Sequence, residues 1–326
     1  MSLASSLNTT FQFDQATKTT FLGQTNTGSA CYHGQASDQW VVGSVPNVSG
    51  YVVSLLLDSV LRHFEQRFQK HPISLHCFFF GKTLPGNFIV EIEDLKTSGK
   101  GYCVCRASLK QYKDVTLPLP TSIHDYNSED FITKVHGLFT MGNMETEQGR
   151  TYYHKNPKAP SRDKLVPTNY FIMGDLVNAK VDPSTFPRMA DTGDLISERS
   201  SSKDNHETVA GQPELSQCMS FADGRPIDMK SLAYWSDMFL TPPFLLGPSF
   251  WGGNIWCPTM ELSIQFKGIP SNTSEILAHF KVPHIINNRF DLDGELFDGD
   301  GNLLALTRHQ CLVVDWSRNT KTTAKM

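Results

Sequence analysis

The chain has 326 residues, of which 39% are hydrophobic and 19% charged, with 29 basic and 33 acidic side chains and a formal net charge of −4. This composition excludes a chain that is disordered throughout, and the near balance of charge lacks the basic excess typical of nucleic-acid binding. No apolar run reaches about 18 residues, so no membrane-spanning helix is expected. Residues 1–15 lack the basic and apolar regions of a secretory signal.

The N-terminal part predicts one long helix followed by a meander of strands. Short strand-like pieces lie around Phe21-Leu22 and Gln39–Val42, and turn residues follow at 46–50. Apolar residues then recur with a helical period from Tyr51 to Phe68, over a stripe broad enough to predict a buried helix. Apolar or alternating runs predict the strands that follow: Ile73–Phe80, Asn87–Leu95, Gly101–Gln111 and Ile132–Met141.

The C-terminal part repeats this order on a smaller scale. Residues 142–224 are rich in proline, serine and charge, and Glu198–Glu207 has no apolar residue, so a linker with a solvated insert is expected. A second helix is predicted from Met229 to Leu240, because Pro242-Pro243 prevents its continuation. Strands are predicted at Thr259–Phe266, Ile276–Val282, Arg289–Phe297 and Leu303–Trp316, and the segment Asp298–Asn302 predicts a hairpin between the last two.

A helix followed by antiparallel strands, twice, predicts an α+β fold with two similar halves. The expected division is an N-terminal half at 1–141, a linker and polar insert at 142–224, a C-terminal half at 225–316 and a polar tail at 317–326.

The cysteines and acidic loops offer no metal site. The seven cysteines, at positions 31, 77, 103, 105, 218, 257 and 311, are odd in number and scattered, which predicts small buried thiols in a reducing compartment. The loop that starts at Asp298 has Leu303 at the sixth position, where an EF-hand needs glycine. Neither a metal nor a cofactor is expected.

The last three residues, Ala324-Lys325-Met326, resemble the small–basic–apolar tripeptide of peroxisomal proteins and follow a polar tail. A peroxisomal import receptor is therefore one expected partner, and the alternative location is the cytoplasm.

Several segments resemble the double-hotdog family of acyl-CoA thioesterases, of the thioesterase II type. In the C-terminal part they are Ser220–Asp228, Leu232–Asp237, Pro258–Phe266 and Asp293–Arg308, and in the N-terminal part Trp40, Pro46–Tyr51 and Ser74–Phe78. The resemblance implies two hotdog units fused in one chain, each a curved antiparallel sheet wrapped around a helix. It also implies hydrolysis of acyl-CoA to fatty acid and CoA.

Position by position, the resemblance implies a catalytic site of Asp237, Thr259 and His309. Asp237 would deprotonate a water molecule that Thr259 and His309 orient, and a backbone N–H near Ser49-Gly50-Tyr51 would polarise the thioester carbonyl. The family often has Gly-Gly-Tyr where this chain has Ser49-Gly50-Tyr51. The Cβ of Ser49, which glycine lacks, would restrict how closely the backbone can approach an acyl group.

The last strand departs further from the family pattern. The family has glutamine at the position of His309, and in this chain the glutamine is the next residue, Gln310. Since successive strand side chains point to opposite faces, only one of these two residues reaches the site unless a bulge intervenes. A purely structural role is an equal alternative for His309 and for Thr259. His63, His76, His136 and His284 are expected to be structural, and the run Phe78–Phe80 to be core.

Two other functions remain open. One is a protein that binds acyl thioesters without hydrolysing them. The other is a biosynthetic hotdog enzyme that acts on a polyketide or acyl thioester, in which the same base would abstract a proton. The exposed sheet edges of a fused hotdog also allow a homo-oligomer.

Overall fold

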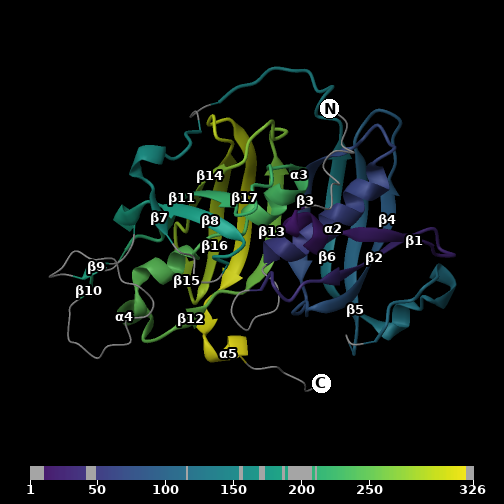
Figure 1. Ribbon diagram of the computed structural model, residues 1–326, viewed down its shortest axis with the longest axis horizontal. Coiled ribbons are helices and arrows are strands. Elements are labelled where there is room, and N and C mark those ends of the chain that lie inside the picture. Colours follow the sequence, from purple (N-terminus) through teal and green to yellow (C-terminus); the bar gives the residue numbers. More distant parts are fainter. Residues whose placement is uncertain are drawn as a thin grey trace.

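The computed structural model describes residues 11–41, 49–114, 117–153, 157–168, 173–185, 188–189, 208–209 and 211–320. Figure 1 shows two groups of strands side by side, with α2 against one group and α3 beside the other. No helix within these ranges is long and apolar enough to cross a membrane.

The N-terminal half is built from a short helix, a long helix and six strands. The elements are α1 (Gln12–Ala16), β1 (Thr19–Gln24), β2 (Ala30–Ala36), α2 (Ser49–Phe64), β3 (His71–Phe79), β4 (Gly86–Lys96), β5 (Cys103–Tyr112) and β6 (Phe131–Gly142), with 3-10 turns η2 (Ile123–Asp125) and η3 (Ser128–Asp130) before β6. The four strands predicted after the helix are confirmed, whereas β2 was not predicted and Gln39-Trp40 form a bend rather than a strand.

The C-terminal half has a shorter helix and more strands. Its sheet strands are β7 (Val166–Thr168), β8 (Val177–Val181), β11 (Glu214–Phe221), β13 (Thr259–Phe266), β14 (Ile276–Lys281), β15 (Ile285–Ile286), β16 (Arg289–Phe297) and β17 (Leu303–Leu312). Beside them lie α3 (Met229–Trp235), α4 (Pro248–Trp251), α5 (Ser317–Thr320), the 3-10 turns η4 (Arg162–Lys164), η5 (Pro183–Thr185) and η6 (Pro242–Leu246), and two strand pairs, β9 (Arg188–Met189) with β10 (Thr208–Val209) and β12 (Ile255–Trp256) with β18 (Val314–Asp315).

One antiparallel sheet runs through both halves. Within the described residues it has 14 strands in the order β1-β2-β4-β5-β6-β3-β13-β17-β16-β14-β11-β8-β7, and β15 pairs with β16. The halves join where β3 pairs with β13, from Glu261 opposite Phe78 to Gln265 opposite Ser74. β7, β8 and β11 come from the interval 142–224, so part of the expected linker pairs with the C-terminal sheet.

The two helices differ from their predicted lengths. α2 begins at Ser49 and stops at Phe64, four residues short of Phe68, because the chain turns there through bonds such as Arg67 N–H to the Phe64 carbonyl. α3 stops at Trp235 rather than Leu240. The Ser236 hydroxyl donates a hydrogen bond to the Ala233 carbonyl, and the side-chain amide of Gln217 donates one to the Met238 carbonyl. Because side chains satisfy these two carbonyls, the helix does not have to continue in order to satisfy them.

A shared core lies between the helices and the inner face of the sheet. Aromatic rings from both halves meet there: Tyr234 of α3 lies 5.2 Å from Trp40 and 5.3 Å from Phe13, measured between ring centroids. Six of the seven cysteines are buried and all seven are free, as predicted. The core prediction is wrong for Phe78 and Phe80, whose exposed fractions are 45% and 65%.

A buried charge network also joins the halves. Asp58 of α2 accepts from the Lys230 ammonium of α3 at 3.2 Å, and that ammonium lies 3.0 Å from a carboxylate oxygen of Asp14. Arg225 forms a two-bond pair with the same Asp14, at 2.7 and 3.0 Å. Arg225 also pairs with Asp228; burial alone would raise the pKa of Asp228, but the guanidinium and its neighbours hold it below 3.8. No local pattern of residues predicted this network.

Candidate active site

Asp237 lies just beyond the end of α3, at the junction with the start of α2. Its side chain is buried, and one carboxylate oxygen, Oδ2, accepts a 2.7 Å hydrogen bond from the Gly50 N–H in the first turn of α2. The N-terminus of a helix attracts negative charge, so the contact fixes the position of the carboxylate. The two halves of the chain therefore each contribute to this site.

His309 lies on β17 and faces the same space. Its ring is fully buried, and its Nε2 atom lies 3.3 Å from Oδ1 of Asp237. This is an ion-pair distance, but the alignment is not that of a hydrogen bond, so both ring nitrogens are buried without a hydrogen-bond partner among the described residues. The Phe239 ring stands perpendicular to the imidazole, with centroids 5.5 Å apart, and fixes its plane. Buried polar atoms normally have a hydrogen-bond partner, so these two nitrogens set His309 apart from an ordinary core histidine.

Thr259 lies on β13, and its hydroxyl contacts Cys311 of β17. Thr259 stands opposite Cys311 in the pairing of β13 with β17, and the Cys311 thiol donates to the Thr259 hydroxyl over 3.7 Å. Burial, together with the charge of Asp237, raises the pKa of the Cys311 thiol well above 9.0 even though the Thr259 contact opposes this. The thiol is therefore protonated at neutral pH and is a poor nucleophile.

The other predicted site residues have different places. Gln310 is exposed on the opposite face of β17, so His309 is the member of the pair that faces inward. The Tyr51 side chain is fully buried in the N-terminal half, where its hydroxyl donates to the Ala16 carbonyl. Ser49 opens α2 beside Gly50, whose N–H is already directed at Asp237. The involvement of Gly50 with Asp237, and the presence of Cys311, were not predicted.

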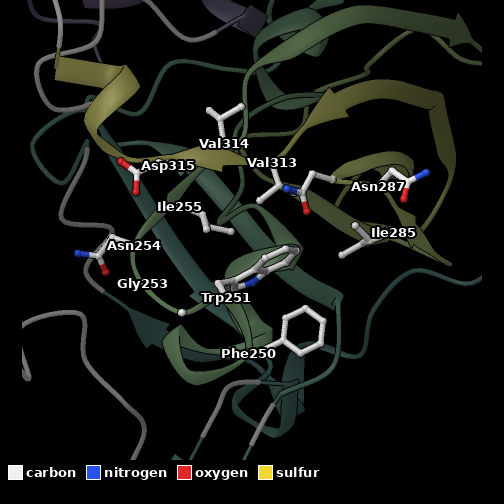
Figure 2. Close-up of a pocket in the computed structure, with 12 residues that line it drawn as sticks. Phe250, Trp251, Gly253, Asn254, Ile255, Ile285, Asn287, Val313, Val314 and Asp315 are labelled. Atoms are coloured by element: carbon white, nitrogen blue, oxygen red, sulfur yellow. The ribbon is translucent and has the colours of Figure 1, made fainter.

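A cavity of about 460 Å³ lies beyond this cluster, where β17 continues into β18. Figure 2 shows the residues around it, which come from α4, β12, β15, β18 and the loops beside these elements. Its lining is mixed, with Trp251, Ile255 and Val313 among the apolar side chains and Asn287 and Asn288 among the polar ones.

The cavity lies further along the same stretch of chain as His309. Val313, which lines it, follows His309 by four residues and comes just after the end of β17. His309, Cys311 and Val313 are all buried.

Replacing Gly50 by alanine is expected to disturb the site from the helix side. A Cβ there would lie 2.8 Å from both the Ala233 carbonyl oxygen and Asp237 Cβ. Relief of this overpacking requires α2 to move away from α3, at a cost of about 1–3 kcal/mol, and it lengthens the bond to Asp237. We expect a lower melting temperature and lower turnover together. A Gly149→Ala control, where a Cβ has open space, should change neither.

Both halves of the chain match models of known protein families. Residues 36–121 match the acyl-CoA thioesterase N-terminal domain family and residues 174–313 match the acyl-CoA thioesterase C-terminal domain family. No curated protein sequence matches the chain.

Solved structures resemble the whole chain at low identity. A putative thioesterase II from Thermobifida fusca YX is 17% identical, with a TM-score of 0.70, over 94% of this chain and 98% of that one. An acyl-CoA thioesterase II TesB2 from Mycobacterium marinum is 15% identical, with a TM-score of 0.62, over 93% and 98%. The dehydratase domain of the polyketide PpsC from Mycobacterium tuberculosis is 9% identical, with a TM-score of 0.50, over 92% and 98%. At these identities the structures share the fold, and the two family matches together show that the chain belongs to the acyl-CoA thioesterase family of double-hotdog thioester hydrolases.

Proposed function

We propose that the protein hydrolyses acyl-CoA to free acid and CoA with a water molecule that binds beside Asp237 and His309. The observation that carries this proposal is the fully buried imidazole with no hydrogen-bond partner, 3.3 Å from a carboxylate. A water in this space would donate one proton to Oδ1 of Asp237 and use His309 as its second partner. Thr259 contacts Cys311, the second residue after His309 on β17.

The chemistry then proceeds in two steps. Asp237 takes a proton from the water as its oxygen attacks the thioester carbonyl carbon, which gives a tetrahedral oxyanion. Collapse of this intermediate breaks the carbon–sulfur bond, and the proton on Asp237 passes to the departing CoA sulfur. The aspartate is thus regenerated, and no group is oxidised or reduced.

This proposal changes the expected role of Gly50. Its N–H was a candidate to polarise the substrate carbonyl, but in the structure it is directed at Asp237. We therefore assign it to positioning the base, with Oδ2 held by α2 and Oδ1 directed at the water. The Cys311 thiol, protonated because of its raised pKa, supports water rather than sulfur as the nucleophile.

The test is an assay of thiol release from acyl-CoAs of several chain lengths, combined with binding measurements. Release of CoA by the wild-type protein, with no loss when Cys311 is replaced by alanine, is the expected result. Binding of acyl-CoA without release would support a non-hydrolytic binding protein instead. A change in the acyl group with the thioester intact would support a biosynthetic hotdog enzyme.

The His309→Gln variant is expected to stay active. Glutamine has an amide that can donate to and accept from the water, so it can replace the imidazole as the second partner of the water. In the sheet, β13 and β16 place Leu262 and Leu292 opposite His309, so neither neighbouring strand offers a polar replacement at that position.

The measurement is kcat and kcat/KM for both proteins. The glutamine variant should keep most of the wild-type activity. A His309→Leu control, which removes this partner of the water, should lose about 100-fold or more in kcat. A leucine variant as active as the glutamine variant would show that the side chain at this position has no part in the reaction.

The proposal of peroxisomal import rests on the C-terminal tripeptide of the sequence alone. Ala324-Lys325-Met326 lies outside the described residues. A fluorescent fusion that reaches peroxisomes with these residues and remains cytoplasmic without them would support it.

A further inference from the structure

Besides His309, three buried side chains have a polar atom without a hydrogen-bond partner among the described residues: Thr83, Trp235 and Thr307. Thr83 lies in the turn between β3 and β4, and Trp235 packs on Phe221 at the end of β11, with ring centroids 4.5 Å apart. Thr307 lies on β17, two residues before His309. Because buried polar atoms are normally hydrogen-bonded, the Thr307 hydroxyl is a second unexplained polar group on the strand that carries the site.

Thr307 and His309 point to the same face of the sheet. Both are buried, whereas Arg308 between them is exposed. The pairing with β16 is regular over this stretch, with Gly294 opposite Thr307 and Leu292 opposite His309. At about 3.4 Å per residue of an antiparallel strand, the Cα atoms of Thr307 and His309 lie roughly 7 Å apart. The two unsatisfied side chains are therefore neighbours on the inner face.

Two aromatic rings lie beside both of these polar groups. A Cβ on Gly294 would be 2.5 Å from the Thr307 hydroxyl oxygen and 2.6 Å from the Phe280 ring, so the hydroxyl and this ring share the space above Gly294. The Phe280 ring packs on Phe239 with centroids 4.4 Å apart, and the Phe239 ring lies against the imidazole of His309. The hydroxyl and the imidazole thus adjoin one pair of rings, of which Phe239 is only partly buried.

Hydrolysis of a thioester also needs a hydrogen-bond donor for the carbonyl oxygen, which becomes negatively charged when water attacks. Two nearby donors are already engaged. The Gly50 N–H donates to Asp237, and the Cys311 thiol donates to the Thr259 hydroxyl. The Thr307 hydroxyl is an O–H donor without such a partner within the described part of the chain.

We propose that the Thr307 hydroxyl donates a hydrogen bond to the thioester carbonyl oxygen and stabilises the oxyanion of the tetrahedral intermediate. This inference rests on the proposed function, for which it supplies the donor that Gly50 does not provide. A donor fixed in a buried place needs little rearrangement as the charge develops, so it stabilises the transition state more than the bound substrate.

The step is balanced without a change in the protonation of Thr307. Asp237 takes a proton from the water, the water oxygen bonds to the carbonyl carbon, and the carbonyl electron pair moves onto the oxygen that Thr307 binds. When the carbonyl forms again, the carbon–sulfur bond breaks, and the proton on Asp237 passes to the CoA sulfur. Thr307 keeps its own proton throughout.

The first test compares Thr307→Val with Thr307→Ser in the thiol-release assay. Valine has nearly the shape of threonine without the hydroxyl, so it should lower kcat by about 100-fold or more and change KM little. Serine keeps the hydroxyl and should retain most of the activity. Loss of a buried hydroxyl that has no partner costs the folded state little, so the valine variant should melt at or above the wild-type temperature. Thr83→Val is the matched control, because Thr83 also has a buried unsatisfied hydroxyl but lies between β3 and β4, and it should leave kcat unchanged.

The second test does not depend on turnover. Acyl-CoA with a heavy carbon isotope at the thioester carbonyl is bound to the Asp237→Asn protein, and infrared difference spectroscopy records the carbonyl stretching band. A hydrogen bond from Thr307 should shift this band to lower frequency, and the shift should disappear when Thr307→Val is added. This readout decides the role of Thr307 even when the wild-type protein releases no CoA, an outcome that contradicts the proposed function alone.

A Thr307→Val protein with wild-type kcat, or a carbonyl band that is the same with and without Thr307→Val, would overturn the proposal. A loss of activity confined to acyl groups that carry a hydroxyl or oxo substituent would also overturn it, and would assign Thr307 to recognition of the acyl group.

Discussion

The Asp237→Asn variant is expected to lose between about 100-fold and 10,000-fold in kcat, the range usual for removal of a general base. Asparagine has nearly the same shape, and its carbonyl oxygen can still accept the hydrogen bond from Gly50. It cannot take a proton from water. The fold and the affinity for acyl-CoA should therefore change little. Thiol release measures the loss, and calorimetric titration with acyl-CoA measures the retained binding.

A matched control separates this effect from a general loss of charge. Asp300 is exposed in the hairpin turn between β16 and β17, so Asp300→Asn removes the same charge far from the buried pair. It should leave kcat unchanged. An Asp237→Asn protein with wild-type turnover would show that another group activates the water.

The Lys230→Met variant is expected to destabilise the fold by up to about 3–5 kcal/mol, because Asp58 and Asp14 each lose one of two cations and keep only Arg62 and Arg225, respectively. Lys230 is 4% exposed and its ammonium lies within 3.2 Å of both Asp58 and Asp14. Since Asp58 and Asp14 come from the N-terminal half and Lys230 from the C-terminal half, the loss should also loosen the contact between α2 and α3. Urea or thermal unfolding measures the change in the free energy of unfolding.

A double-mutant cycle tests whether the effect comes from the pair. Asp58→Asn together with Lys230→Met removes both charges, so the double variant should lose less than the sum of the single losses. Arg308→Met is the surface control, because Arg308 is 53% exposed beside Asp291 and Asp293 and should change stability by less than about 1 kcal/mol. Simple additivity of Asp58→Asn and Lys230→Met would contradict a coupled network.

Local patterns predicted most of the strands. Arg289–Phe297 and Thr259–Phe266 match β16 and β13 at both ends. The hairpin after β16 forms as predicted, with Gly301 at a φ of +87° and the Asp298 carboxylate accepting from the backbone N–H of Asn302. Strand alternation and turn chemistry are both local, which is why they can be read without tertiary information.

The sequence-based predictions were wrong or incomplete where tertiary packing determines whether a side chain is buried and which residues it contacts. Ser74, His76 and Phe78 alternate along β3 on its outer face, so the period of two places Phe78 outside, although the run Phe78–Phe80 taken as a block suggested core. The network of Asp14, Asp58 and Lys230 joins residues far apart in the sequence, so no local pattern could indicate it.

The residues of the candidate site came from the resemblance, whereas their arrangement depends on tertiary packing. The resemblance supplied Asp237, Thr259 and His309, and strand alternation correctly allowed only one of His309 and Gln310 to face inward. The bond from Gly50 to Asp237 depends on the packing of α2 against α3 across the two halves. The part played by Cys311 depends on its register opposite Thr259.

The most direct test is product analysis of the wild-type protein with acyl-CoA in water enriched in heavy oxygen. Equal amounts of CoA and free acid, with one solvent oxygen in each acid molecule, are the outcome expected if the Asp237–His309 pair activates water. An intact thioester after prolonged incubation with bound protein, whether unchanged or altered in its acyl part, would contradict it.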